Sequence, residues 1–472
     1  MKFKQTRYIL HLIIAVFAIA LGSCIEDGIS TSPSDQPAFS CDSLKMGVVF
    51  TEEITTTHKF VVHNRHSKGM NISSITLSGE NAQYFRLNVD GMSGRDFNNV
   101  EIRAKDSIFI LVNATLPNAG IDLPLDINAN IDFVTNGVTS TVVVNAQGQD
   151  VNRLTAVTID SDTRFDSAKP YQVFDSLVVA AGARLTLAPG TRLYFHDGSR
   201  LIVRGTLDSQ GTSESPVNIC GDRTGNVVTD ITFDLMSRQW QGVYFTPSSR
   251  DNVLSHTSLR NTVYGVTVYG DEDGTPDLTI VNSQLRNSGD LVLDAVNARI
   301  NAYGSEFAEA ASGLVRLVGG EHVFNHCTFA NYYLFSAISG PALTFEYLFP
   351  DEMGESTLPL MKAEFANSIV YGLGSEFSHG DLTDSQVYFR NCLFKSSGSD
   401  DDNFVGCLWG SDPLYYTVRE DYLFDYRLKD GSPAIAAGNG ELTAPQAAVD
   451  FYGLQRGTTP DLGAYVYTPS VQ

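Results

Sequence analysis

Four acidic residues stand close together in the middle of the chain: Asp271, Glu272, Asp273 and, four positions later, Asp277. Ca²⁺ prefers carboxylate and carbonyl oxygens as ligands, and alternate residues of a loop can supply them. Asp271, Asp273 and Asp277 are therefore a candidate calcium site. A solvated, charged loop between two strands is the competing interpretation of the same residues.

Side chains that could perform acid–base catalysis are present but scattered. His256 and Arg260 lie four positions apart and could form an acid–base pair, but histidines in ladders and loops are more often structural. The cysteines form no C-x-x-C pair and no metal-binding spacing. Hydrolysis of a glycosidic bond needs two suitably placed carboxylates, and no such set is recognisable. We therefore expect no catalytic residues and no cofactor other than a possible Ca²⁺.

The elements that must position these residues show a repeated three-residue step in the second half of the chain. In each step a small residue is followed two positions later by an apolar one; the small residues are Thr257, Ser283, Ser305, Cys327, Ser368 and Cys392. They are separated by 26, 22, 22, 41 and 24 positions, and 41 is close to two steps. Short strands at such a period are typical of a solenoid, in which each turn buries its face against its neighbours.

The alignment extends beyond this step. Three positions before the small residues stand Ile280, Ala302, Phe324, Phe365 and Phe389, and two further back stand Leu278, Ile300, His322, Ala363 and Val387. Alternate inward positions are what a strand requires. Asn, Gly or His stands directly before most of the small residues, and Asn or Gly four after; Asn and Gly tolerate the left-handed conformation of a corner. A pair of β-sandwiches is the alternative, but hairpin signals are scarce.

The chain resembles the right-handed parallel β-helix (pectin-lyase-like) proteins. The resemblance rests on Leu185-Thr-Leu-Ala-Pro-Gly190, Leu201-Ile-Val-Arg-Gly-Thr-Leu207 and Trp240-Gln-Gly242, and covers about residues 155–467. It also includes Asp430-Gly-Ser-Pro433 and Asp461-Leu-Gly-Ala-Tyr465, which are similar to a terminal anchor-like segment of such proteins. The resemblance implies the fold but no single activity, because lyases, hydrolases and non-catalytic binders share it.

The N-terminus has the pattern of an export signal. Lys2, Lys4 and Arg7 precede an apolar run over residues 8–21, which is too short for a convincing membrane span. Leu21-Gly-Ser-Cys24 resembles a bacterial lipobox, which implies cleavage after residue 23 and acylation of Cys24, with palmitate among the acyl chains. Glu26 and Asp27 resemble the acidic surface-export signal of Bacteroidetes lipoproteins. An ordinary cleaved signal and a solvated charge pair are the alternatives.

The formal charge of the chain is −22 at pH 7. Removal of the signal makes it more negative by three, because Lys2, Lys4 and Arg7 are its charged residues. A strongly acidic protein repels the phosphates of nucleic acids and of anionic lipids, so we expect neither as a partner.

The sequence predicts an all-β protein of two folded domains. After the signal (1–23) and a flexible tether (24–38), short strands separated by turns predict an immunoglobulin-like β-sandwich over 39–151. The right-handed parallel β-helix is expected over 152–435 and a C-terminal cap segment over 436–472.

Two functions from different classes fit this organisation. The first is a non-enzymatic scaffold, anchored in the outer membrane by its lipid and facing the cell exterior, that serves as an accessory subunit of an outer-membrane protein complex for assembly or nutrient import. Phe345, Tyr347 and Phe349 are its candidate contact residues, because apolar residues on a projecting loop mark interaction sites. The second is a surface protein that acts on or binds a glycan. It is either a polysaccharide lyase-like enzyme with Ca²⁺ near Asp271–Asp277 or a binder whose tyrosines form stacking platforms.

Overall fold

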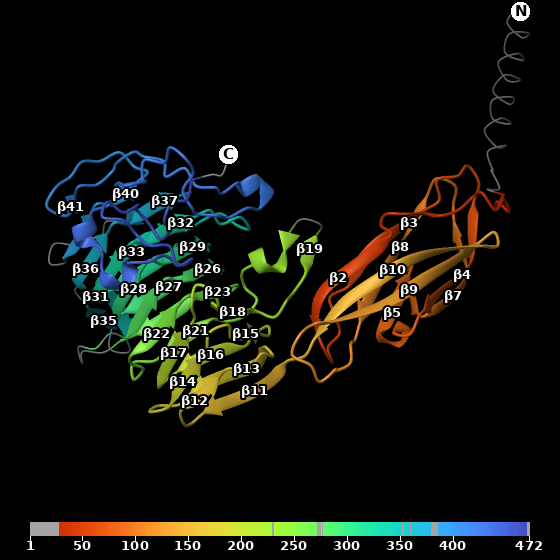
Figure 1. Cartoon of the computed structure of the whole chain (residues 1–472), viewed down its shortest axis with the longest axis horizontal. Helices are drawn as coiled ribbons and strands as arrows, with labels where there is room; N and C mark the ends of the chain where they lie inside the picture. The colour runs from red at the N-terminus through yellow and green to blue at the C-terminus, as the bar shows by residue number, and fades with distance from the viewer. Residues whose placement is uncertain are drawn as a thin grey trace, which may run out of the picture. The chain divides into compact units, whose positions relative to one another are not determined.

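The computed structural model describes residues 28–228, 231–270, 275, 277–351, 354–358, 360–378 and 386–469. The chain divides into two compact units, Met1–Asp150 and Val151–Gln472, each of which is built from strands (Figure 1). The division lies one residue before the predicted one. The helices of the described residues are single 3₁₀ turns: η1 (Ala82–Tyr84), η2 (Phe233–Leu235), η3 (Arg419–Asp421), η4 (Gly440–Leu442) and η5 (Pro445–Ala447).

The first unit contains two five-stranded sheets. One has the order β1 (Ala38–Phe39), β3 (His58–His63), β8 (Ser107–Ala114), β5 (Phe85–Val89), β6 (Met92–Gly94). The other has the order β2 (Ser43–Phe50), β10 (Val138–Gln149), β9 (Leu125–Thr135), β4 (Met70–Ser78), β7 (Asp96–Ile102). Apolar side chains of both sheets share one core, in which Phe60 and Phe133 meet edge to face. The immunoglobulin-like class remains a prediction.

The second unit is built on two large parallel sheets of 17 and 10 strands. The larger contains β11 (Asn152–Ile159), β13 (Tyr171–Val179), β15 (Arg192–Phe195), β16 (Arg200–Val203), β18 (Val217–Gly221), β21 (Val243–Phe245), β23 (Thr257–Arg260), β24 (Val266–Tyr269), β26 (Gln284–Ser288), β27 (Leu293–Val296), β29 (Glu306–Ala310), β30 (Val315–Val318), β32 (Thr328–Asn331), β33 (Leu343–Glu346), β37 (Ile369–Gly372), β38 (Phe377–Ser378) and β40 (Leu393–Phe394). The smaller contains β12 (Thr163–Phe165), β14 (Arg184–Leu187), β17 (Thr206–Gln210), β22 (Asn252–Ser255), β25 (Leu278–Val281), β28 (Arg299–Tyr303), β31 (Gly320–Asn325), β36 (Leu360–Ala366), β39 (Val387–Arg390) and β41 (Phe404–Val405). Two short antiparallel hairpins interrupt the succession of these strands along the chain. They are β19 (Asn226–Val228) with β20 (Ile231–Thr232), and β34 (Leu348–Asp351) with β35 (Gly354–Thr357).

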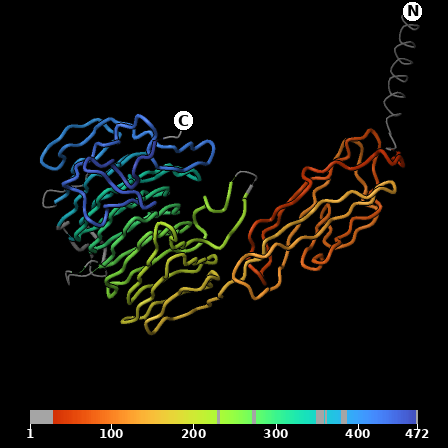
Figure 2. Tube along the Cα trace, in the orientation of Figure 1, coloured from red at the N-terminus to blue at the C-terminus, as the bar shows by residue number. Residues whose placement is uncertain are grey.

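The strand pairings separate the larger sheet into two ladders that both begin at β13. Ladder A runs β16–β21–β24–β27–β30–β33–β38, and ladder B runs β15–β18–β23–β26–β29–β32–β37–β40. The smaller sheet is ladder C. From β24 to β32 the chain visits A, C and B in turn, three times over, so each turn adds one strand to every ladder. Figure 2 shows these turns as repeated rungs. The arrangement is all-β, parallel and compatible with a β-helix.

The strand register confirms the columns predicted from the sequence. In ladder C, Ile280 pairs with Ala302, Ala302 with Phe324, Phe324 with Phe365, and Phe365 with Phe389. The Phe324 and Phe365 rings stack at 4.9 Å between centroids, and those of Phe365 and Phe389 at 4.6 Å. Such offset stacking adds to the hydrophobic stabilisation of a core.

The small-residue column is a ladder of buried hydrogen bonds. The backbone N–H of Thr257 donates to Ser283 Oγ, and that of Ser283 to Ser305 Oγ, both at 3.0 Å. Further along, Cys327 N–H donates to Ser368 Oγ at 3.0 Å. Each hydroxyl thus satisfies an amide of the preceding turn, and a larger side chain would fill the space between turns.

The corners before this column are left-handed, as expected. Asn282, Gly304, His326, Asn367 and Asn391 have φ values between 45° and 57°. Four positions after the small residues, Asn261, Asn287 and Gly372 also have positive φ. The prediction is wrong for Asn331, whose φ is not positive. In the turn before it, the position four after Ser305 is Glu309, which has a φ of 49°. His322 is buried, and its Nε2 donates to the carbonyl of Gly319 at 2.7 Å.

The ladders end at Val405, before the predicted limit of 435. The following segment packs on the outward face of ladder B, where Tyr415, Tyr426 and Leu462 share a core with Ala308 and Ala330. In Figure 1 this segment is the blue trace over β32 and β37. Because both faces of β29 and β32 are covered, every residue of these two strands is buried.

Replacement of Phe365 by Ala should lower the free energy of unfolding of the second unit by about 3–5 kcal/mol, because it opens a cavity between two stacked rings. Chemical denaturation followed by tyrosine and tryptophan fluorescence would measure the change. Tyr264→Ala, which truncates an exposed ring, is the matched control and should change stability by less than about 0.5 kcal/mol. Equal effects of the two substitutions would contradict the packing described.

Candidate functional site

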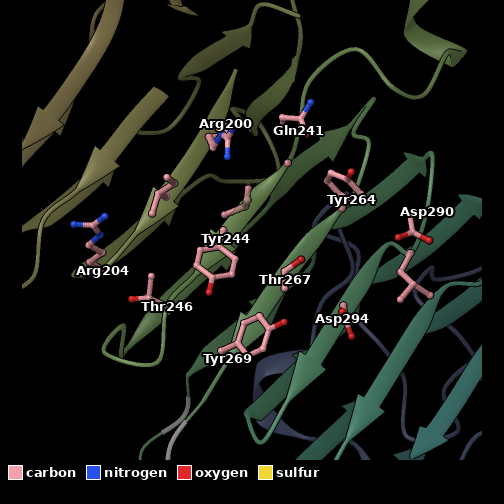
Figure 3. A pocket seen from close by; sticks show the side chains of 15 residues that line it. Arg200, Arg204, Gln241, Tyr244, Thr246, Tyr264, Thr267, Tyr269, Asp290 and Asp294 are labelled. Carbon is pink, nitrogen blue, oxygen red and sulfur yellow. The ribbon is translucent and has the colours of Figure 1, made fainter. Parts of the chain in front are cut away.

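A groove of about 560 Å³ lies on the outward face of ladder A. It crosses the strands β16, β21, β24 and β27, which belong to four successive turns (Figure 3). The polar and aromatic side chains along it are Arg200, Arg204, Gln241, Tyr244, Thr246, Tyr264, Thr267, Tyr269, Asp290 and Asp294. A groove with several convergent polar groups is the default candidate for a binding site.

Two glycines form the floor of the groove. Gly242 and Gly265 have φ values of +118° and +71°. A Cβ atom on Gly242 would lie 2.2 Å from the carbonyl oxygen of Gly265, and one on Gly265 would lie 2.2 Å from that of Leu291. Only glycine fits this backbone and this spacing. Both positions therefore require glycine, because the backbones of successive turns approach each other closely here.

Three tyrosines stand beside this floor. Tyr244 and Tyr264 are 39% and 54% exposed, and the rings of Tyr244 and Tyr269 are 5.6 Å apart between centroids, tilted by 55°. Tyr244 pairs with Thr267 on the next strand, and Thr267 with Asp294 on the one after. Figure 3 shows Tyr244, Thr267 and Tyr269 projecting from neighbouring strands. Exposed aromatic faces beside hydroxyl groups are suited to the apolar faces and hydroxyls of sugar rings.

The charged side chains of the groove differ in whether they have a hydrogen-bond or ion-pair partner. Arg316, on β30, donates two hydrogen bonds to Asp294, of 2.8 and 2.9 Å, so that this carboxylate is neutralised. Arg200 and Arg204 are exposed, and neither guanidinium has a hydrogen-bond or ion-pair partner among the residues that the structure describes. Two arginines without partners in a strongly acidic protein form a local positive side to the groove. Burial raises the pKa of Tyr269, with Asp294 as a further cause, so its hydroxyl remains protonated.

The candidate calcium residues are only partly described. Asp277 is buried; its carboxylate lies 3.0 Å from Arg250 Nη1 and accepts a hydrogen bond of 2.8 Å from Arg299 N–H. These partners compete with a cation for the same oxygens. Asp271 and Asp273 lie outside the described residues, as do Cys24, Glu26 and Asp27. The calcium, lipidation and export assignments therefore stay predictions.

The predicted partner-contact residues need a correction. Phe345 does not lie on a projecting loop but on β33, where its side chain points inward and is 3% exposed. Its ring meets those of Phe365 and Phe389 edge to face at 5.9 and 6.3 Å. Phe345 is a core residue because ladder A needs an apolar inward position at this turn. Tyr347 is half-buried, and the side chain of Phe349 lies outside the described residues.

The described residues contain neither a metal-ligand cluster nor a membrane-spanning helix. No three His, Cys, Asp or Glu side chains in them are close enough together to hold a metal ion. No helix in them combines the length and the hydropathy needed to cross a membrane.

Sequence reasoning missed the groove because its residues are far apart in the chain and belong to the ladder that the sequence pattern did not reveal. The available signal was the alternation of Val243, Phe245, Val266 and Val268 with outward Tyr244 and Thr267. Its period of two marks half-buried strands.

Comparisons with known proteins give no assignment. No family model matches the chain, and no curated protein matches it. Two solved structures are similar over small parts. One is a protein of unknown function from Porphyromonas gingivalis W83, with a TM-score of 0.19, 16% identity, and coverage of 27% of this chain and 50% of that one. The other is a family 123 glycoside hydrolase from Clostridium perfringens, with a TM-score of 0.18, 12% identity, and coverage of 24% and 26%.

Proposed function

We propose that the protein is a lipid-anchored cell-surface protein that binds a polysaccharide in the groove of a right-handed parallel β-helix, with an immunoglobulin-like domain as a spacer. The observation that carries this proposal is the glycine-floored groove flanked by Tyr244, Tyr264 and Tyr269. The groove crosses four strands, and strands in a sheet are about 4.8 Å apart, so it accommodates an extended ligand of roughly 14 Å or more.

The two free arginines favour an anionic polysaccharide. A guanidinium binds a carboxylate or a sulfate ester through paired N–H donors. Arg200 is the first residue of β16 and Arg204 directly follows its last residue, and both line the groove together with Ile202. They can therefore contact charged groups at separate places along the groove. The shared chemistry is an anionic sugar, either a uronate or a sulfated residue.

Binding without chemical conversion is the form of activity that we propose. An inverting hydrolase uses one carboxyl group as acid and a second as base. Of the two carboxylates that line the groove, Asp294 is held by both hydrogen bonds from Arg316, which leaves Asp290 alone.

Lipid anchoring should depend on Cys24. Cys24→Ser in the full-length precursor should abolish incorporation of labelled palmitate and move the protein from the membrane to the aqueous fraction, because one polypeptide without its acyl chains loses its anchor. Fractionation and labelling in the native host would measure this. Membrane retention of the variant together with unchanged labelling would contradict the assignment.

Binding should be weakened by loss of the groove aromatics. Tyr264→Ala and Tyr244→Ala should each weaken binding about three- to tenfold, because each removes one stacking surface. Arg204→Ala should weaken binding of uronate and sulfated polysaccharides but not of neutral ones, and less so at high salt. Affinity electrophoresis and calorimetry with the three polysaccharide classes would separate these outcomes.

Tyr452→Ala is the matched control, since Tyr452 is 49% exposed outside the groove. No binding to any of the three classes, or equal binding by the control and the groove variants, would contradict a glycan site.

A second candidate function is that of a scaffold subunit in an outer-membrane protein complex. The observation that favours it is an apolar row before and at the start of β9, where Ile121, Leu123 and Leu125 are exposed, Leu123 to 73%. Exposed apolar residues in a group mark protein interaction sites.

This candidate predicts that affinity purification through a C-terminal tag recovers an outer-membrane protein in stoichiometric amount. Leu123→Asp should abolish that recovery, whereas Val138→Asp, at an apolar residue of 38% exposure outside the row, should not. Recovery of the lipoprotein alone would leave the glycan function without a competitor.

A further inference from the structure

The C-terminal segment contains a small hairpin over residues 414–429, which we call the lid hairpin. Tyr415 bridges to Leu428 and Val418 to Leu423, and the backbone N–H of Lys429 donates to the Leu414 carbonyl at 2.8 Å. Its buried side, which includes Tyr415 and Tyr426, packs on ladder B. At the other end of the hairpin, the Arg419 guanidinium donates hydrogen bonds to the carbonyls of Tyr332 and Tyr333. The hairpin is thus a distinct element held mainly by its contacts with the ladder.

A pair of carboxylates lies beneath it. Glu306 and Glu309, both on β29, are buried. The Tyr426 hydroxyl of the lid hairpin donates to Glu309, and the Tyr465 hydroxyl donates to Glu306. Arg286 on β26 is the cation of this layer, with Nη2 2.6 Å from Glu306 Oε1. Two carboxylates therefore face one guanidinium, and an unbalanced buried charge is strongly unfavourable.

Glu309 is also an exception at its corner position, four residues after the small residue of its turn. The same corner position is Asn261, Asn287 and Gly372 in other turns, and these residues have positive φ at little cost. Glu309 holds a φ of 49° without being Asn or Gly. Backbone strain of this kind persists where the side chain has a role that the rest of the structure supports. Strain and burial of a carboxyl group at one residue are two independent signs of such a role.

We infer that protonation of Glu309 controls the opening of the lid hairpin. The hairpin stays closed while the Glu309 carboxyl is protonated, and it opens to water more often once this carboxyl is ionised. Opening removes Tyr426 from Glu309 and lets water reach the Glu309 carboxylate. This inference is independent of the glycan groove, which lies on ladder A.

The direction of the pH effect follows from the surroundings of Glu309. Burial raises its pKa from an ordinary value of 4.5 to about 7, and Glu306 adds to this, while Arg286 and Tyr426 act in the opposite direction. Burial raises the pKa of Glu306 as well. Because the closed form binds the proton more tightly than the open form, closure is most favourable below pH 4.5, and this advantage is lost as the pH rises to about 7.

The tyrosines around Glu309 keep their protons over this range. Tyr426 and Tyr415 from the lid hairpin, Tyr332 after β32, and Tyr465 from the C-terminal segment all have pKa values raised by burial. Arg286 faces it from β26, and Asp425 from the hairpin lies near Glu306. His326 contacts Thr443, outside the lid hairpin, so its titration acts on another part of the segment.

Hydrogen exchange of the mature full chain, measured by mass spectrometry and corrected for intrinsic rates, tests the inference. The opening equilibrium constant of residues 414–429 should rise roughly 30-fold between pH 5.5 and 8.5. Glu309→Gln, which keeps the shape of the protonated carboxyl, should lose most of this rise. Glu364→Gln is the control, because Glu364 is on ladder C and pairs with Lys362 at 3.3 Å; it should keep the full rise.

Tyr426→Phe provides a second variant if Glu309→Gln does not fold. It removes the donor that favours the ionised carboxyl, so the midpoint of the rise should move to higher pH. Equal protection of residues 414–429 at both pH values, or an unchanged pH dependence in Glu309→Gln, would overturn the inference.

Discussion

The hydrogen bond from a backbone N–H of one turn to the buried hydroxyl of the next fixes how the turns of the second unit lie on one another. It recurs at Ser283, Ser305 and Ser368 with donor–acceptor distances of 3.0 Å. A one-residue slip would break these bonds and also move every inward side chain to the outside. The same register aligns the phenylalanine stack, so the hydroxyl column and the aromatic core favour the same strand register.

The stacking determines where function can be placed. Because each turn gives one strand to each ladder, outward residues of successive turns form rows across the strands. On ladder A such rows carry Tyr244, Thr267 and Tyr269 beside a glycine floor, and they remain open to solvent. On ladder B the rows are covered by the C-terminal segment, which is why carboxyl groups become buried there. One repeated backbone thus presents an open face and a closed face with different chemistry.

The sequence predicted the parts of this fold that repeat. Ladders B and C were recognisable because Ser, Cys and Thr recur where the interior is narrow, and because Ile280 and its successors alternate with polar residues. Ladder A shows no repeat of its own, since its inward residues, such as Val266 and Leu293, have no small neighbour at a fixed spacing. Phe345 was assigned to a contact surface for this reason. The groove, the coverage of ladder B and the position of Glu309 depend on contacts between distant segments, which no local pattern records.

A crystal structure of the second unit at about 2 Å resolution is the most direct test of this account. It should show Ser283 Oγ, Ser305 Oγ and Cys327 Sγ above one another in one interior column, each turn displaced by the spacing of neighbouring strands, about 4.8 Å. Density that places these three side chains in unrelated environments would contradict the stacking, and with it both the groove on ladder A and the covered carboxylates on ladder B.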